Sequence, residues 1–128
     1  VVPGAGTNYS YVKKLRAYMS AAPNTNISNM RWYSDGSSGF GTGVACTAKN
    51  LGTTFGTHYN TAMSGGSSLF GYTSGSPLDG DGTDTGPFVP ADNTTYIGDI
   101  IELQISVAST ATNGALSAET LTLAWDEV

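Results

Sequence analysis

The chain is 128 residues long, with a formal net charge of −5, a single cysteine and charged residues at only 12% of its positions. This composition excludes an intramolecular disulfide. It argues against a nucleic-acid partner, whose phosphates require a basic face, and against a membrane span, which requires about 18 consecutive apolar residues. Gly, Ser, Thr and Asn dominate the polar residues and favour turns and strands, so a single all-β domain over residues 1–128 is predicted.

The first predicted strand covers residues 9–19, where side chains alternate and aromatic residues favour a sheet over a helix. One face carries Tyr9, Tyr11, Leu15, Ala17 and Met19, and the other carries Lys14 and Arg16, with Lys13 as the one exception. A turn leads into a second strand over residues 27–33, in which Trp32 is the expected core aromatic. Shorter strands are expected over residues 44–48 and 53–59, and Cys46 is expected to be a small buried residue.

Residues 61–92 have the composition of an extended surface excursion rich in Gly, Ser and Asp. A loop of this length is uncommon in a compact domain and often has a function. The apolar residues within it imply that parts of the excursion dock on the rest of the domain or on another chain; they are Leu69, Phe70, Tyr72, Leu78, Phe88 and Val89.

The clearest strand patterns lie at the C-terminal end, over residues 100–107 and 119–127, where apolar residues recur at every second position. In the first, Glu102, Gln104 and Ser106 are expected to face water. The small, polar linker contains Asn113-Gly114, so the two strands are predicted to be antiparallel neighbours in one sheet. Together these strands predict an antiparallel β-sandwich, either immunoglobulin-like or jelly-roll, with a long Gly/Ser/Asp-rich loop excursion.

Charge is distributed unevenly along the chain. Four of the five basic residues precede the first acidic residue, Asp35, so residues 1–34 carry +4 and the remainder carries one lysine against ten acids. We expect the basic N-terminal strand to pair within the fold with the C-terminal strand, which contains Glu119, Asp126 and Glu127. Pairing between neighbouring copies in an assembly is the alternative.

Candidate catalytic and metal sites have little support in the sequence. His58 is the only histidine, and no serine lies in a nucleophile elbow, so a surface or strand histidine is the preferred interpretation. Asp79, Asp81 and Asp84 resemble a calcium loop, but threonines occupy key ligand positions and a solvated turn is favoured. Paired carboxylates such as Asp99 and Glu102 leave a glycosidase open without singling out a pair. We therefore expect no enzyme activity and no cofactor.

Both ends of the chain resemble small all-β virion structural proteins of tailed phages. The N-terminal resemblance lies in the pattern of Ile27, Asn29, Met30, Arg31 and Trp32 before a Gly/Ser loop. The C-terminal resemblance lies in Leu103, Ile105 and Val107, then a spacer with Gly114, then residues 121–127. The resemblance covers about half of the chain and implies a capsid decoration or cement protein, located in the virion, whose partners are a major capsid protein or copies of itself in a homo-oligomeric assembly.

Interface residues follow from that expectation, because a few aromatic or basic anchors supply most of the energy of an interface. The expected contacts are Lys13, Lys14, Arg16, Leu69, Phe70, Tyr72, Phe88 and Val89. Two alternatives stay open. One is an extracellular or cell-surface filament subunit of the pilin type that assembles by strand donation. The other is a carbohydrate-binding module with a stacking platform of Tyr59, Phe70 and Tyr72.

Overall fold

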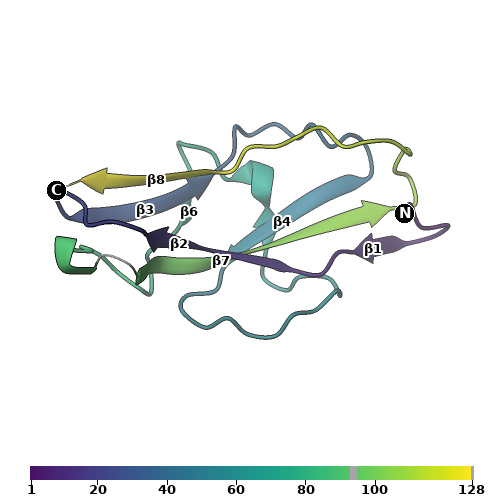
Figure 1. Cartoon of the computed structure of the whole chain (residues 1–128). Helices are drawn as coiled ribbons and strands as arrows, with labels where there is room; N and C mark the ends of the chain where they lie inside the picture. Colours follow the sequence, from purple (N-terminus) through teal and green to yellow (C-terminus); the bar gives the residue numbers. More distant parts are fainter. Residues whose placement is uncertain (93–94, 128) are drawn as a thin grey trace.

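The computed structural model describes residues 1–92 and 95–127 and contains two antiparallel sheets that pack face to face (Figure 1). Two short 3-10 helices interrupt the strands. The elements in chain order are β1 (Thr7–Tyr9), β2 (Lys13–Met19), β3 (Ile27–Tyr33), β4 (Val44–Asn50), β5 (Ser67–Ser68), η1 (Leu69–Gly71), β6 (Leu78–Asp79), η2 (Pro90–Asp92), β7 (Thr95–Ala108) and β8 (Thr122–Glu127). The predicted all-β sandwich is confirmed, whereas the choice between immunoglobulin-like and jelly-roll types stays a prediction.

Sheet A is built around β7, the longest strand. The whole of β4 pairs with one edge of β7, over residues 101–107. β1 and β2 pair in succession with the other edge of β7. The predicted strand over residues 9–19 is therefore two strands. They are separated because the backbone N–H of Val12 donates to the carbonyl of Tyr59 instead of to β7. Val12 is fully buried there, so the break in the strand anchors the segment that contains Tyr59.

Sheet B has the order β6-β3-β8. The two predicted C-terminal strands exist, but they are not neighbours: β7 is the centre of sheet A and β8 is an edge of sheet B, paired with β3. The prediction that these two strands are neighbours in one sheet was wrong, because the linker between them is long enough to cross from one sheet to the other. Period-two patterns identify strands but do not identify their partners.

The core lies between the sheets in two clusters. One joins Trp32 of β3 to Cys46 of β4 and Ile101 of β7, and the other joins Met30 of β3 to Ile97 of β7. The expectations that Trp32 is a core aromatic and that Cys46 is buried are confirmed. Docking of the excursion is confirmed as well, because Leu69, Leu78 and Phe88 are buried in these clusters. The predicted strand over residues 53–59 is absent, and those residues form an irregular segment instead.

Hydrogen bonds cross between the sheets along one side of the sandwich. The side chain of Asn50 in β4 donates to the carbonyl of Asp79 in β6 (2.8 Å), and the backbone N–H of Asp99 in β7 donates to the carbonyl of Gly80 (2.6 Å). The close approach requires glycine at position 98, which has φ +67°; a Cβ there would lie 2.6 Å from the carbonyl oxygen of Gly80. This side of the sandwich is therefore closed.

Candidate functional site

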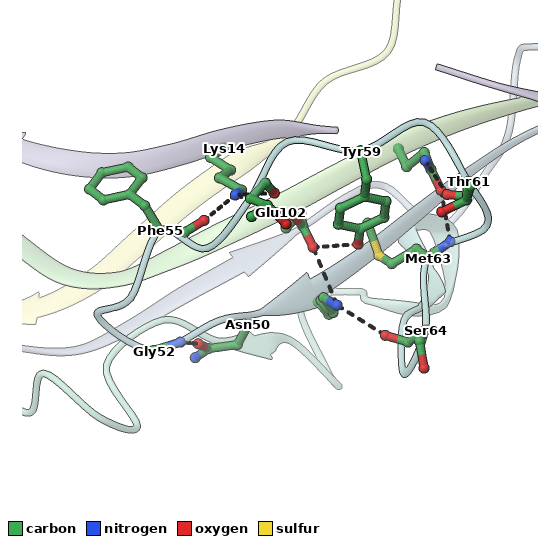
Figure 2. Close-up of polar contacts among 12 residues, drawn as sticks. Lys14, Asn50, Gly52, Phe55, Tyr59, Thr61, Met63, Ser64 and Glu102 are labelled. Atoms are coloured by element: carbon green, nitrogen blue, oxygen red, sulfur yellow. Dashed lines mark hydrogen bonds and ion pairs between the residues drawn. The ribbon is translucent and has the colours of Figure 1, made fainter. Parts of the chain in front are cut away.

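A polar cluster lies on the outer face of sheet A, centred on Glu102 (Figure 2). Pairing across the sheet places Lys14 of β2 and Lys49 of β4 on either side of this residue. Their Nζ atoms lie 3.7 and 3.3 Å from the carboxylate oxygens, and the hydroxyl of Tyr59 donates to Oε2 (2.8 Å). Glu102 is only 1% exposed. The expectation that this face of β7 meets water was wrong for Glu102 and also for Gln104, which is buried too.

The face is covered because residues 53–64, which we call the covering segment, lie over it. Lys14 donates to the carbonyls of Phe55 and Thr57, and Lys49 donates to that of Ser64 (3.0 Å). The Gln104 amide accepts from the N–H of Met63 (2.9 Å) and donates to the carbonyls of Ser10 and Thr61. These side chains bind main-chain groups of a segment that has no regular structure to satisfy them.

Burial and the hydrogen bond to Glu102 raise the pKa of Tyr59, so its phenol stays protonated and acts as a donor. The two lysines supply the opposite charge that a buried carboxylate needs. His58, next to Tyr59 in sequence, is exposed as expected for a surface histidine. The contacts of Glu102 with the two lysines and Tyr59 therefore fasten the covering segment to sheet A.

A second buried carboxylate, Asp99, organises the acidic loop. It accepts hydrogen bonds from the N–H groups of Thr83 (2.9 Å) and Asp84 (2.7 Å) and from the side chain of Asn50 (2.7 Å). Burial disfavours its charged form, but these hydrogen bonds, led by that from Asp84, hold the pKa of Asp99 below its usual value.

The candidate calcium ligands Asp79, Asp81 and Asp84 are engaged by other groups of the chain. Asp79 accepts from the N–H of Asp81, Asp81 accepts from that of Met30, and Asp84 binds Arg16. Within residues 1–92 and 95–127, no group of three or more His, Cys, Asp or Glu side chains is arranged to hold a metal ion. The interpretation of this loop as a solvated turn rather than a calcium site stays a prediction.

The basic residues expected at an interface are divided between the interior and the surface. Lys14 is buried against Glu102, and Arg16 donates to the carbonyl of Gly98 (2.8 Å) and binds Asp84 (2.6 Å). Both are therefore engaged within the chain. Lys13 is exposed and forms no ion pair with any described residue. The acidic C-terminal strand β8 does pair with a basic residue of the N-terminal part, but its Asp126 binds Arg31 of β3 (2.8 Å). The basic residues of β2 form their ion pairs with Glu102 and Asp84 instead of with β8.

The apolar residues expected at an interface are mostly used in packing. Leu69 and Phe88 are buried, and Phe70 and Tyr72 pack against the core. Val89 is exposed. The proposed sugar-stacking platform does not form from its named residues, because Tyr59 lies on the outer face of sheet A while Phe70 packs edge-to-face with Phe40 against the core (centroids 5.6 Å apart).

The feature that the sequence interpretation missed is an apolar seam between the edges β2 and β8, opposite the closed side. Two cavities open along it. One of about 520 Å³ lies where Lys13 faces Leu121, and one of about 250 Å³ lies where Met19 faces Trp125. Leu15 faces the interior from β2 yet is 38% exposed, and Trp125 is 46% exposed. The alternation predicted which side chains point inward but gave no sign that this edge would be uncovered.

Comparison of the chain with protein-family models, with curated proteins and with solved structures gave no match. None of the helices in the described part of the chain is both long and apolar enough to cross a membrane.

Proposed function

We propose that this chain is a non-enzymatic structural protein of a virus particle, a capsid decoration or cement protein that acts by binding neighbouring subunits. The observation that carries the proposal is the contrast between its polar and apolar groups. The buried carboxylates Glu102 and Asp99 are held by internal partners, whereas large apolar side chains are exposed along the seam. Exposed apolar surface of this kind is typical of a protein that works by association.

The virion context rests on the resemblance at the two ends of the chain. Those ends include β3 and β8, which pair with each other in sheet B, and the C-terminal half of β7 in sheet A. The residues of the resemblance therefore belong to the framework of the sandwich. A decoration protein of this kind needs no cofactor, since its effect comes from surface buried against a capsid.

A filament subunit is the second candidate, favoured by one observation: β2 and β8 are both free edges that flank an apolar groove. A strand supplied by another subunit is recognised through backbone hydrogen bonds to such an edge and through side chains inserted into pockets.

Electron microscopy of the native assembly separates these candidates. Purified virus particles should contain the chain, detected by mass spectrometry, and their reconstruction should place the sandwich at repeated positions on an icosahedral capsid. Helical fibres composed of this chain alone would instead support the filament subunit. Particles that lack the chain after gradient purification, together with an absence of fibres, would contradict both the decoration role and the filament role.

A further inference from the structure

The two long sides of the sandwich differ. On the closed side, Asn50 and Asp99 make hydrogen bonds from sheet A to the segment at Asp79 and Gly80. On the seam side, no hydrogen bond or ion pair joins β2 to β8 among the described residues. The two sheet edges there are held apart over cavities whose walls are mainly apolar.

Exposed apolar side chains gather at this opening. Tyr11 lines the larger cavity, Trp125 lines the smaller one, and Leu15 lies on β2 between them. All three are among the large hydrophobic residues that the fold leaves exposed. Apolar side chains that face the interior of a fold but remain solvent-exposed are typical of a surface that another molecule covers.

Both strands that border the seam are free edges. Among the strands that the structure describes, β2 pairs only with β7, and β8 pairs only with β3. Within the described part of the chain, the backbone groups on the outer edge of each strand have no hydrogen-bond partner. Such edges accept a further strand readily.

The two strands also run in the same direction (Figure 1). The start of β2 lies across the larger cavity from Leu121, and the end of β2 lies across the smaller cavity from Trp125. A two-fold axis perpendicular to the strands would therefore make both edges antiparallel to their counterparts in one operation. Two-fold dimers with self-complementary interfaces are the commonest soluble oligomers.

Charges at the ends of the seam favour the same arrangement. Lys13 is at the start of β2 and Glu127 is at the end of β8, at opposite ends of the seam. Both are exposed, and neither forms an ion pair with a described residue. The two-fold operation reverses the direction of the seam, so it places Lys13 of one copy near the Glu127 end of the other.

We propose that the seam is a self-association surface, on which a second copy of this chain docks with β8 against its β8 and β2 against its β2. The two sheets would then continue across the interface and enclose the apolar cavities of both copies. This inference deepens the assembly role proposed above and rests on it by naming the partner that covers the seam.

Sedimentation velocity of the 128-residue chain over a concentration series tests the docking surface. The unmodified chain should dimerise, and Leu15→Lys and Trp125→Lys should each weaken the dimer by about 100-fold, because each charge enters a desolvated contact twice per dimer. Phe55→Lys is the matched control, since Phe55 is an exposed aromatic that belongs to the covering segment on the outer face of sheet A and lines neither cavity of the seam. Its dimer should stay within about twofold of the unmodified one.

Charge reversal tests the orientation independently of apolar contact. Lys13→Glu and Glu127→Lys should each weaken the dimer about tenfold, because two symmetry-related pairs become repulsive, and the double variant should recover it. Circular dichroism checks that every variant remains folded. Recovery in the double variant supports the antiparallel docking, and its absence overturns that arrangement.

A folded chain that stays monomeric at every concentration overturns the inference. So does a dimer that is weakened equally by Phe55→Lys and Trp125→Lys, or a seam that instead takes up an unrelated extended peptide. A chain that binds virus particles as a monomer overturns only this inference. A chain that dimerises through the seam but is absent from particles overturns only the decoration role.

Discussion

At the scale of single residues, the most informative side chain is Glu102, because its environment reverses what its position in the sequence suggested. A carboxylate in an alternating strand is normally the water-facing partner of the apolar residues. Here Lys14 and Lys49 flank it across the sheet, and Tyr59 closes over it. The surroundings stabilise a charge that would otherwise be costly to bury.

Glu102→Gln is expected to destabilise the fold by about 3 kcal/mol, because it leaves two lysines beside a neutral amide in a buried site. Urea unfolding followed by circular dichroism measures the change. Glu127→Gln removes an exposed carboxylate with no ion pair among the described residues, and should shift stability by no more than about 0.5 kcal/mol. Equal effects from the two substitutions would contradict a structural role for the buried ion pairs.

Asp99 makes stability depend on pH. Its pKa in the folded chain lies below its usual value, so its stabilising effect is present above the unfolded-state pKa of about 3.9 and is lost as the pH falls through the folded-state pKa. Asp99→Asn should lower stability at neutral pH by about 3 kcal/mol, since Thr83 and Asp84 lose a charged acceptor. It should also flatten the loss of stability below about pH 4.

Unfolding measured at a series of acidic pH values checks this expectation. Asp35→Asn serves as the control, because Asp35 is exposed and, among the described residues, accepts a hydrogen bond only from the backbone of Ser37. If Asp99→Asn keeps the full acid dependence of the unmodified chain, other carboxylates account for it.

At the scale of elements, the covering segment shows how an irregular stretch is ordered by side chains of the sheet beneath it. Gln104 alone makes three hydrogen bonds to main-chain groups, two of them to Thr61 and Met63 in the segment. Gln104→Leu should free this segment while the sandwich remains folded. Limited proteolysis within residues 53–64 should become about tenfold faster, as local opening costs less free energy.

Ser106→Ala provides the matched control for Gln104→Leu. Ser106 lies two residues along β7, on the same face, and its side chain makes no hydrogen bond with a described residue. Its rate of cleavage should equal that of the unmodified chain. Cleavage that begins in residues 109–121 rather than in the covering segment would show that Gln104 supports a different part of the fold.

Gly98→Ala tests the closed side of the sandwich. The substitution combines a left-handed backbone angle with a Cβ that meets Gly80 and the sulfur of Met30, so a loss of about 3 kcal/mol is expected. Gly75→Ala is the control, because nothing lies within 4 Å of a Cβ there and its φ is not left-handed. Thermal unfolding measures both, and a mild effect at Gly98 would show that the two sheets can separate there easily.

The extent to which elements were predictable follows from the physics of strands. β3, β4, β7 and β8 were predicted because their apolar residues alternate, and this pattern depends only on local geometry. The partners of β7 and β8 were not predictable, because pairing is decided by distant residues. The strand expected over residues 53–59 failed for a related reason: its carbonyls accept hydrogen bonds from the side chain of Lys14 and from the backbone of Val12 instead of from a sheet ladder.

The distinction between local pattern and distant contact also explains which parts of the candidate sites could be predicted. Burial of Cys46 and Trp32 was predictable from composition, whereas the expected interface residues Leu69 and Phe88 turned out to lie in the core. A sequence shows that a residue is apolar without showing whether its own chain or a neighbour covers it. The seam is the clearest case, because Leu15 points inward as predicted and is still exposed.

At the scale of the whole molecule, the two sheets are expected to unfold together. Trp32 of sheet B and Cys46 of sheet A belong to one apolar cluster, and Leu123 of β8 contacts both clusters. Hydrogen bonds on the closed side tie the sheets as well. Because neither sheet can lose the other without exposing its inner face, a single cooperative transition is predicted, as for most domains of this size.

Two local probes test this cooperativity, one in each sheet. In a Trp125→Phe variant, the fluorescence of Trp32 reports on sheet B. Cys46, the only cysteine, reports on sheet A through its reaction with a thiol reagent. Burial raises the pKa of Cys46 and shields it, so the thiol should react only when the core opens. Coincident midpoints in a denaturant series are expected. A thiol that becomes reactive before the Trp32 signal changes would show that sheet A opens first, and that the seam already weakens the contact between the sheets in the isolated chain.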